Sequence, residues 1–124
     1  MKRLFLFLCF AMLSISMVSA DELTMTVSGM NTTMTNTIGT RKIVAKINGN
    51  GRVSSLTVGG TELLGSNGIY FDYTTANDNQ GLSPSKVSII KNTADYCEVL
   101  YSSTSGNTIW EQGFIMRKGV QRLY

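Results

Sequence analysis

Short alternating segments separated by turn signals constrain the fold of this chain more than any other feature. After residue 20, runs of about four to eight residues alternate apolar and polar side chains, and turn-forming residues interrupt them roughly every ten residues. The clearest example is Arg41–Ile47, then Asn48–Gly51, then Arg52–Val58, because Asn and Gly tolerate the positive φ of tight hairpin turns. No helical periodicity longer than two turns occurs after residue 20. The pattern predicts an all-β sandwich or barrel with antiparallel pairing.

The segment Thr108–Tyr124 (TIWEQGFIMRKGVQRLY) contains the strongest alternation. One side of an extended strand here would carry Trp110, Gln112, Phe114 and Met116, and the other would carry Glu111, Gly113, Ile115 and Arg117. The first side is typical of a strand that faces a core. Lys118-Gly119 interrupts the run, and Val120–Tyr124 is predicted to start a further strand.

The first twenty residues have the three parts of a secretory signal peptide. Met1–Arg3 is basic, Leu4–Met12 is apolar, and Val18–Ala20 supplies small residues before Asp21. The apolar run is shorter than the roughly 20 residues that span a bilayer. We therefore expect cleavage after Ala20 and a secreted or periplasmic protein without a membrane span.

Removal of this signal changes the charge and the cysteine content. Loss of Lys2 and Arg3 leaves nine basic residues against eight acidic ones, with no basic cluster that could follow a phosphate backbone. Nucleic acid is therefore not an expected partner. Cys97 is the cysteine that remains, and its alternation with Val99 and Tyr101 predicts a small buried apolar residue. The chain has no histidine, which argues against a catalytic thiolate or a zinc site.

Two groups of polar residues could form chemical sites. Glu111 with Arg117 and Lys118 could form a carboxylate-binding or acid–base surface, but a solvated strand face is the favoured interpretation. Asp72 and Asn77–Asn79 offer oxygen ligands for calcium, yet they lack the acidic spacing of a calcium loop and are interpreted as a polar loop. We predict no catalytic residue, metal or cofactor in this chain.

Aromatic side chains form the third candidate, because aromatic rings in a groove can stack on the apolar faces of sugars. Most members of this set alternate with apolar neighbours and are expected in the core. The whole set is Tyr70, Phe71, Tyr73, Tyr96, Tyr101 and Trp110. Tyr70 and Trp110 are the two candidates for carbohydrate binding.

The sequence divides into three parts. Residues 1–20 are the predicted signal peptide, and 21–40 are interpreted as an exposed polar lead-in with a possible edge strand, Leu23–Val27. Residues 41–124 are predicted to form a partial β-sandwich.

The order of segments resembles the N-terminal domain of rhamnogalacturonan lyases of polysaccharide lyase family 4. The family pattern G-x-V-x-S-L-x-x-x-G-x-E-L is similar to Gly51–Leu63 (GRVSSLTVGGTEL), which is followed by GIYFDYTT and VSIIKNTADYCEVLYSS. A last pattern, with an aromatic strand and a later tyrosine, is similar to Phe114–Gly119 (FIMRKG) and Leu123-Tyr124. The resemblance covers most of residues 41–124.

This resemblance implies a sandwich of the galactose-mutarotase-like kind and cleavage of the rhamnose–galacturonate backbone of pectin by β-elimination. In that reaction a base removes the C5 proton of a galacturonate, and the C4–O bond breaks. The family's catalytic lysine and histidine lie downstream of the strand that Phe114–Tyr124 resembles. No position here can receive those roles, so the chain is expected to be an incomplete N-terminal portion that is inactive alone.

Two functions therefore remain open. The first is the N-terminal fragment of a secreted rhamnogalacturonan lyase, with pectic rhamnogalacturonan as its partner. The alternative is a stand-alone carbohydrate-binding β-sandwich of an exported polysaccharide-utilisation protein.

Overall fold

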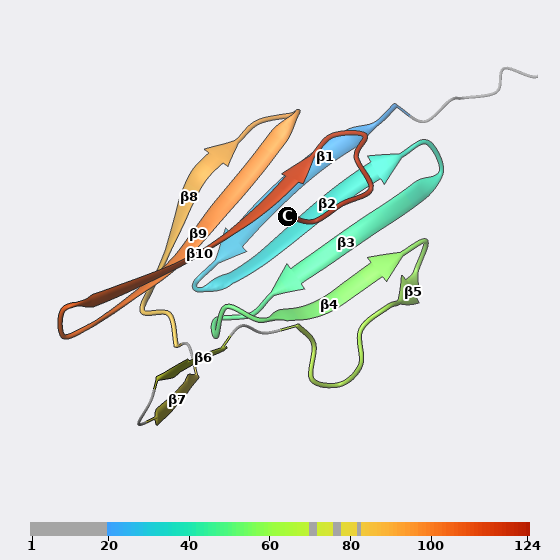
Figure 1. The fold of residues 1–124 in the computed structure, drawn as a ribbon. Coiled ribbons are helices and arrows are strands. Elements are labelled where there is room, and N and C mark those ends of the chain that lie inside the picture. The colour runs from blue at the N-terminus through green and yellow to red at the C-terminus, as the bar shows by residue number, and fades with distance from the viewer. Residues whose placement is uncertain (1–19, 70–71, 76–77, 82) are drawn as a thin grey trace, which may run out of the picture.

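The fold consists of antiparallel β-sheets. A computed structural model describes residues 20–69, 72–75, 78–81 and 83–124, and these contain ten strands and no helix (Figure 1). In the same ranges, no helix has the length and apolar character needed to cross a membrane. The all-β, antiparallel, sandwich-like prediction is confirmed. The galactose-mutarotase-like kind of sandwich stays a prediction.

The first sheet is an antiparallel meander in which each strand pairs with the next along the chain. Its strands are β1 (Glu22–Ser28), β2 (Asn31–Ile38), β3 (Arg41–Ile47), β4 (Val53–Val58) and β5 (Thr61–Glu62). The expected Asn-Gly hairpin joins β3 to β4, with the Gly51 amide donating to the Asn48 carbonyl at 2.9 Å. Short turns are sufficient to join these strands because antiparallel neighbours need no crossover helix.

The second sheet has three strands in the order β10-β9-β8. They are β8 (Lys86–Asn92), β9 (Tyr96–Ser105) and β10 (Thr108–Arg117). A separate two-stranded sheet consists of β6 (Asp72–Thr75) and β7 (Asp78–Gly81). Asp72, Asp78 and Asn79, interpreted from the sequence as parts of a polar loop, therefore lie in strands β6 and β7.

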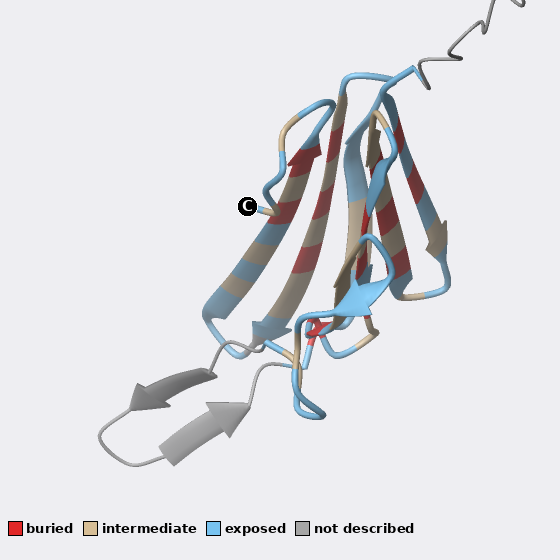
Figure 2. Ribbon diagram, turned by 90° about the vertical axis from the view of Figure 1, so that its right-hand side faces the viewer, coloured by how far each residue is buried: buried red, intermediate tan, exposed pale blue. Residues whose placement is uncertain are grey.

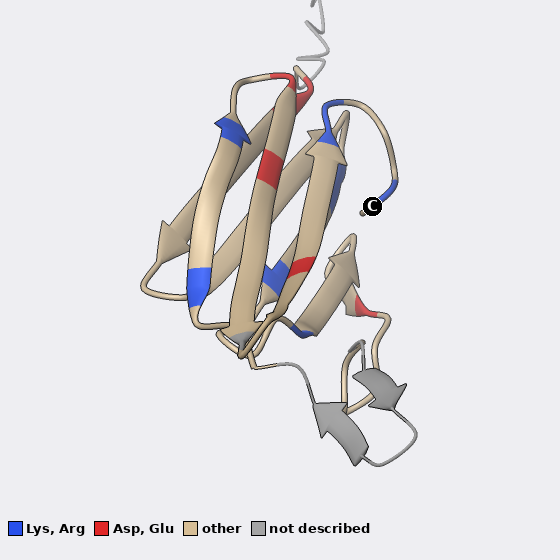
Figure 3. Ribbon diagram, turned by 60° about the vertical axis from the view of Figure 1, so that its left-hand side comes forward, with Lys and Arg blue, Asp and Glu red and all other residues tan. Residues whose placement is uncertain are grey.

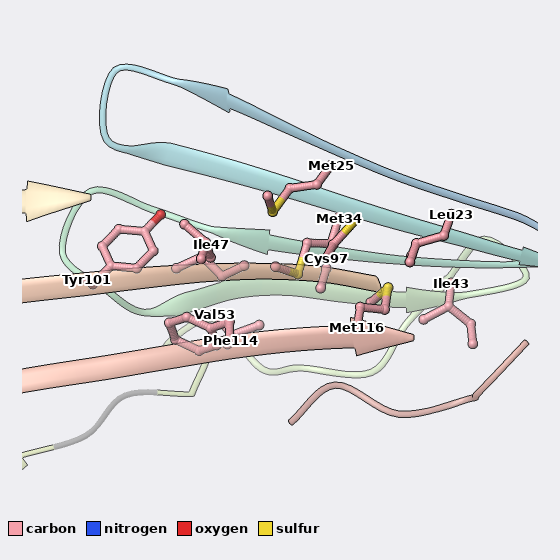
Figure 4. Close-up of a cluster of buried hydrophobic side chains, with 12 residues drawn as sticks. Leu23, Met25, Met34, Ile43, Ile47, Val53, Cys97, Tyr101, Phe114 and Met116 are labelled. Carbon is pink, nitrogen blue, oxygen red and sulfur yellow. The ribbon is translucent and has the colours of Figure 1, made fainter. Parts of the chain in front are cut away.

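The two larger sheets pack face to face, and alternating residues of their strands enter the space between them (Figure 2). Ile43, Ala45 and Ile47 point inward as their alternation predicts, whereas Lys42 and Lys46 are exposed. The apolar core comprises Leu23, Met25, Met34, Ile43, Ala45, Ile47, Val53, Cys97, Val99, Tyr101, Phe114 and Met116 (Figure 4). Leu56 and Val58 are partly buried against this core.

The interpretation of residues 21–40 as an exposed lead-in is corrected by the burial of β2. Met34 and Asn36 have no exposed surface, and Thr32 has 1%. β2 is internal because β1 pairs with one of its edges and β3 with the other. Polar composition concealed this role, since two of its inward positions are polar and are satisfied by the second sheet.

Beyond β10 the chain turns and lies again beside that strand. The amide and carbonyl of Tyr124 bond to those of Ile115 at 2.9 and 2.8 Å, and Met116 pairs with Leu123. Gly119 has a φ of 72°, a conformation that favours glycine. The predicted strand after the Lys118-Gly119 interruption is thus present as a short bridge.

Candidate functional site

Trp110, one of the two residues predicted to bind carbohydrate, lies at one end of the core. It is partly buried on the inner side of β10, and a Cβ on Gly51 would be 3.6 Å from its ring and 3.1 Å from Pro84. Gly51 has a φ of 71°, so the hairpin and the buried Pro84 pack beside the indole. Tyr70 lies outside the described residues, and carbohydrate binding by Tyr70 or Trp110 stays a prediction.

The structure does not bring Glu111 together with Arg117 and Lys118. Glu111 is opposite Ser102 and Arg117 is opposite Tyr96, six positions apart on β10 and therefore separated by roughly 20 Å. Lys118 instead forms an exposed ion pair with Asp95, at 3.8 Å. Figure 3 shows charged positions spread over β8, β9 and β10 without one dense cluster. An acid–base surface from these three residues is not formed.

The proposed oxygen ligands for calcium fall largely outside what can be described. Asn77 is outside the described residues, and the backbones of Asp72, Asp78 and Asn79 belong to the β6–β7 hairpin. Within the described part of the chain, no three Cys, Asp or Glu side chains are grouped to hold a metal ion.

Tyr101 is a core residue, as its alternation predicts. It is fully buried and its ring meets Phe114 edge to face, with centroids 5.8 Å apart. Its hydroxyl donates to the Met30 carbonyl at 2.9 Å and accepts from Thr32 at 2.8 Å. Burial raises the pKa of this phenol. Tyr101 therefore joins the two sheets.

Cys97 has the predicted role of a small buried apolar residue. It is free, has no exposed surface, and its thiol lies 3.4 Å from the Asn92 side-chain oxygen. Burial raises the pKa of the thiol, which keeps it in the unreactive protonated form.

The outer face of the second sheet carries a cluster that the sequence interpretation did not find. We define the Tyr–Arg–Tyr cluster as Tyr96, Arg117 and Tyr124, with Lys91 and Glu98 at its border. The Arg117 guanidinium lies 5.6 Å from the centroid of Tyr96 and 5.7 Å from that of Tyr124. The Lys91 ammonium lies 5.2 Å from the Tyr96 centroid. These distances are those of cation–π contacts.

Strand pairing and the return of the chain produce this cluster. Arg117 and Tyr96 are direct cross-strand partners on β10 and β9, with both side chains on the outer face. Tyr124 joins them because its backbone pairs with Ile115. The preceding turn is held from inside by buried Asn36, whose amide donates to the carbonyls of Arg117 and Val120 at 2.8 and 2.9 Å.

Glu98 determines the polarity of the cluster border. Its carboxylate accepts a hydrogen bond from the Tyr96 hydroxyl at 2.8 Å, and this bond is the main cause that raises the pKa of Tyr96. Glu98 is also the cross-strand partner of Lys91. The border of the cluster therefore carries one anion, Glu98, opposite one of the two cations, Lys91.

The segment that carries the first family-like motif forms a hairpin closed by a carboxylate. Glu62 accepts hydrogen bonds from the Ser55 hydroxyl at 2.5 Å and from the amides of Leu56 and Leu64 at 2.9 and 3.1 Å. These bonds lower the pKa of Glu62, and the bond from Ser55 has the largest effect. The Ser and Glu of the motif therefore contact each other and stabilise the β4–β5 connection.

Comparison with models of known protein families, with curated proteins and with solved structures finds no match to this chain.

Sequence reasoning missed the Tyr–Arg–Tyr cluster because it treated Tyr96 as one member of a core set. Tyr96 and Tyr101 are five positions apart, an odd number, so they must point to opposite faces of β9. That parity was available in the sequence. The approach of Tyr124 was not, because it depends on the turn that Asn36 holds.

Proposed function

We propose that this chain is the N-terminal part of the catalytic β-sandwich of an exported rhamnogalacturonan lyase. One observation supports the proposal most strongly: the motif segments occur in family order, and they form successive units of one antiparallel sandwich. The first motif forms the β4–β5 hairpin, and the last forms β10 with its return.

Residues of the first motif stabilise the β4–β5 hairpin. Val53 is buried with 2% exposure, Gly60 has a φ of 84°, and Glu62 bonds to Ser55. These contacts give the motif residues Val53, Gly60 and Glu62 a role in the fold rather than in catalysis.

The proposed reaction of the complete enzyme is β-elimination at a galacturonate of the rhamnose–galacturonate backbone. A base removes the C5 proton, the electron pair forms the C4–C5 double bond, and the C4–O bond breaks. The chain has no histidine, so the histidine of the family's catalytic pair has no counterpart among these residues. We also propose export through the signal at residues 1–20.

Reading the gene past the codon for Tyr124 tests the fragment proposal. The expected result is an open frame with the remaining sandwich strands and a lysine–histidine pair. The longer product should release unsaturated galacturonate ends from rhamnogalacturonan, detected by ultraviolet absorbance. A stop codon in an intact locus would overturn the proposal. N-terminal sequencing of the exported product should begin at Asp21, and a retained Met1 would contradict signal cleavage.

The second candidate is a stand-alone carbohydrate-binding β-sandwich. It is favoured by the Tyr–Arg–Tyr cluster, in which Tyr124 retains 51% exposure beside a cation. Sugar binding by the 124-residue product of a gene that stops after Tyr124 would support this candidate over the lyase.

A further inference from the structure

The Arg117 guanidinium is held in place by its neighbours without being neutralised. Two rings lie within cation–π distance of it, at 5.6 Å for Tyr96 and 5.7 Å for Tyr124. Lys118 pairs with Asp95, and among the described residues no carboxylate forms an ion pair with Arg117 or Lys91. Contacts with the two rings already restrict the Arg117 side chain, so it would lose less conformational entropy when a ligand binds.

A guanidinium placed beside aromatic rings can still donate hydrogen bonds from its edge. The planar group presents N–H donors in a fork that matches the two oxygens of a carboxylate. The side chain of Arg117 is exposed, while its carbonyl is bound to Asn36. The backbone is therefore held from inside and the charged group faces solvent.

Tyr124 adds an apolar surface next to this donor. Its side chain is 51% exposed, and an aromatic ring with an apolar body suits the C–H face of a sugar. A sugar that stacks on Tyr124 and carries a carboxylate would satisfy both neighbouring groups at once. A neutral sugar would leave Arg117 without a partner.

Glu98 restricts the ligand to a low density of negative charge. Its carboxylate lies beside Tyr96, 2.8 Å from the hydroxyl, and it would repel a second anionic group close to the first. Closely spaced phosphates or sulfates therefore fit poorly, whereas a polymer that alternates charged and neutral sugars fits well.

We infer that the Tyr–Arg–Tyr cluster on the outer face of the second sheet binds one uronate of an acidic polysaccharide, with its carboxylate on Arg117 and its ring on Tyr124. The choice of pectic galacturonate rests on the proposed function, but the class of ligand, a carboxylated sugar, rests on the cluster itself. The bound surface is the outer face of β8–β10, separate from the interior that Trp110 closes.

The test uses the chain expressed from its full 124-residue sequence and titration calorimetry with two matched oligosaccharides. The first is a rhamnogalacturonan oligosaccharide, and the second is the same molecule with its carboxyl groups reduced to alcohols. Loss of the charge-assisted bond should weaken binding of the reduced ligand about tenfold or more. Equal affinity for both ligands, or no binding of the carboxylated one, would overturn the inference. This comparison needs no variant protein.

Substitutions locate the site. Arg117→Gln should weaken binding of the carboxylated ligand about tenfold, Arg117→Lys should weaken it less, and neither should affect the weak binding of the reduced ligand. Tyr124→Leu should weaken both ligands together. Lys42→Gln, which removes an exposed cation from the first sheet, is the charge-matched control and should change nothing. Equal losses in Lys42→Gln and Arg117→Gln would show general charge attraction and overturn the site.

The outcome is separable from the lyase proposal. Uronate binding together with a stop codon after Tyr124 would sustain the site and remove the lyase. Lyase activity in a longer product, with Arg117→Gln leaving affinity unchanged, would remove the site and sustain the lyase.

Discussion

Two tyrosines on β9 show how differently the two faces of one sheet are used. Tyr101 points inward, where its hydroxyl bonds to Thr32 and Met30 and has no exposed surface. Tyr96 points outward, where its hydroxyl bonds to Glu98 and its ring meets Arg117. The inward contacts replace water and cannot be lost without leaving buried polar atoms unpaired. The outward contacts compete with water, so they organise a surface while adding little to stability.

We expect the largest difference in stability between the inner and outer faces of the second sheet when an inward aromatic ring is truncated. Phe114→Ala removes a side chain with 3% exposure that packs against Tyr101, and should lower the free energy of unfolding by about 3–5 kcal/mol. Urea denaturation followed by circular dichroism measures it. Ile109→Ala on the same strand, at 70% exposure, is the control, and a similar loss there would break the comparison.

The next effect concerns the buried amide that joins β2 to the turn after β10. Asn36→Ala removes bonds to Arg117, Val120 and Gly119 and leaves their backbone groups unpaired. We expect a loss of about 2–3 kcal/mol, with faster hydrogen exchange at the Gly119 amide. The exposed Asn50→Ala should stay within about 0.5 kcal/mol. An unchanged exchange rate would show that the turn does not depend on Asn36.

A matched pair of hydroxyl deletions compares the faces directly. Tyr101→Phe should cost about 1–2 kcal/mol, because it leaves the Met30 carbonyl and the Thr32 hydroxyl without their partner. Tyr96→Phe removes a partly exposed bond and should cost less than about 0.5 kcal/mol. Equal costs, measured by thermal unfolding of both variants, would mean that the outer contact is structural.

The smallest effect is a dependence on acid at an exposed carboxylate. Hydrogen bonds lower the pKa of Glu62 in the folded state, so its contribution to stability is complete above the usual glutamate pKa of about 4.3 and is lost as pH falls through the lowered value. The gap in urea midpoint between the wild type and Glu62→Gln should therefore be wider at neutral pH than in acid. In a Ser55→Ala background, the difference in urea midpoint caused by Glu62→Gln should be smaller at neutral pH. A difference that grows in acid would contradict a lowered Glu62 pKa.

The sequence predicted the elements better than it predicted their partners. Alternation gave the inward faces of β3 and β10 and the burial of Cys97, because a side-chain period of two follows from strand geometry alone. The polar composition of β2 led to the wrong prediction that it is exposed. Thr32 and Asn36 are buried because they bond to partners that lie 69 to 84 residues away. Such partners depend on how two sheets pack, which no local pattern encodes. The Tyr–Arg–Tyr cluster was missed for the same reason, since Tyr124 arrives through the turn that Asn36 holds.

Asn36 also has a consequence for the order in which the molecule folds. The first sheet is a local meander and can form from residues 22–62 alone, since each strand pairs with its neighbour. The side-chain amide of Asn36, however, finds its partners only at residues 117–120, after a loop of more than 80 residues has closed. During synthesis the inward face of β2 therefore stays hydrated until residues 117–120 have been made. Association of the two sheets is consequently a late event, and slow folding should arise there rather than in the formation of either sheet.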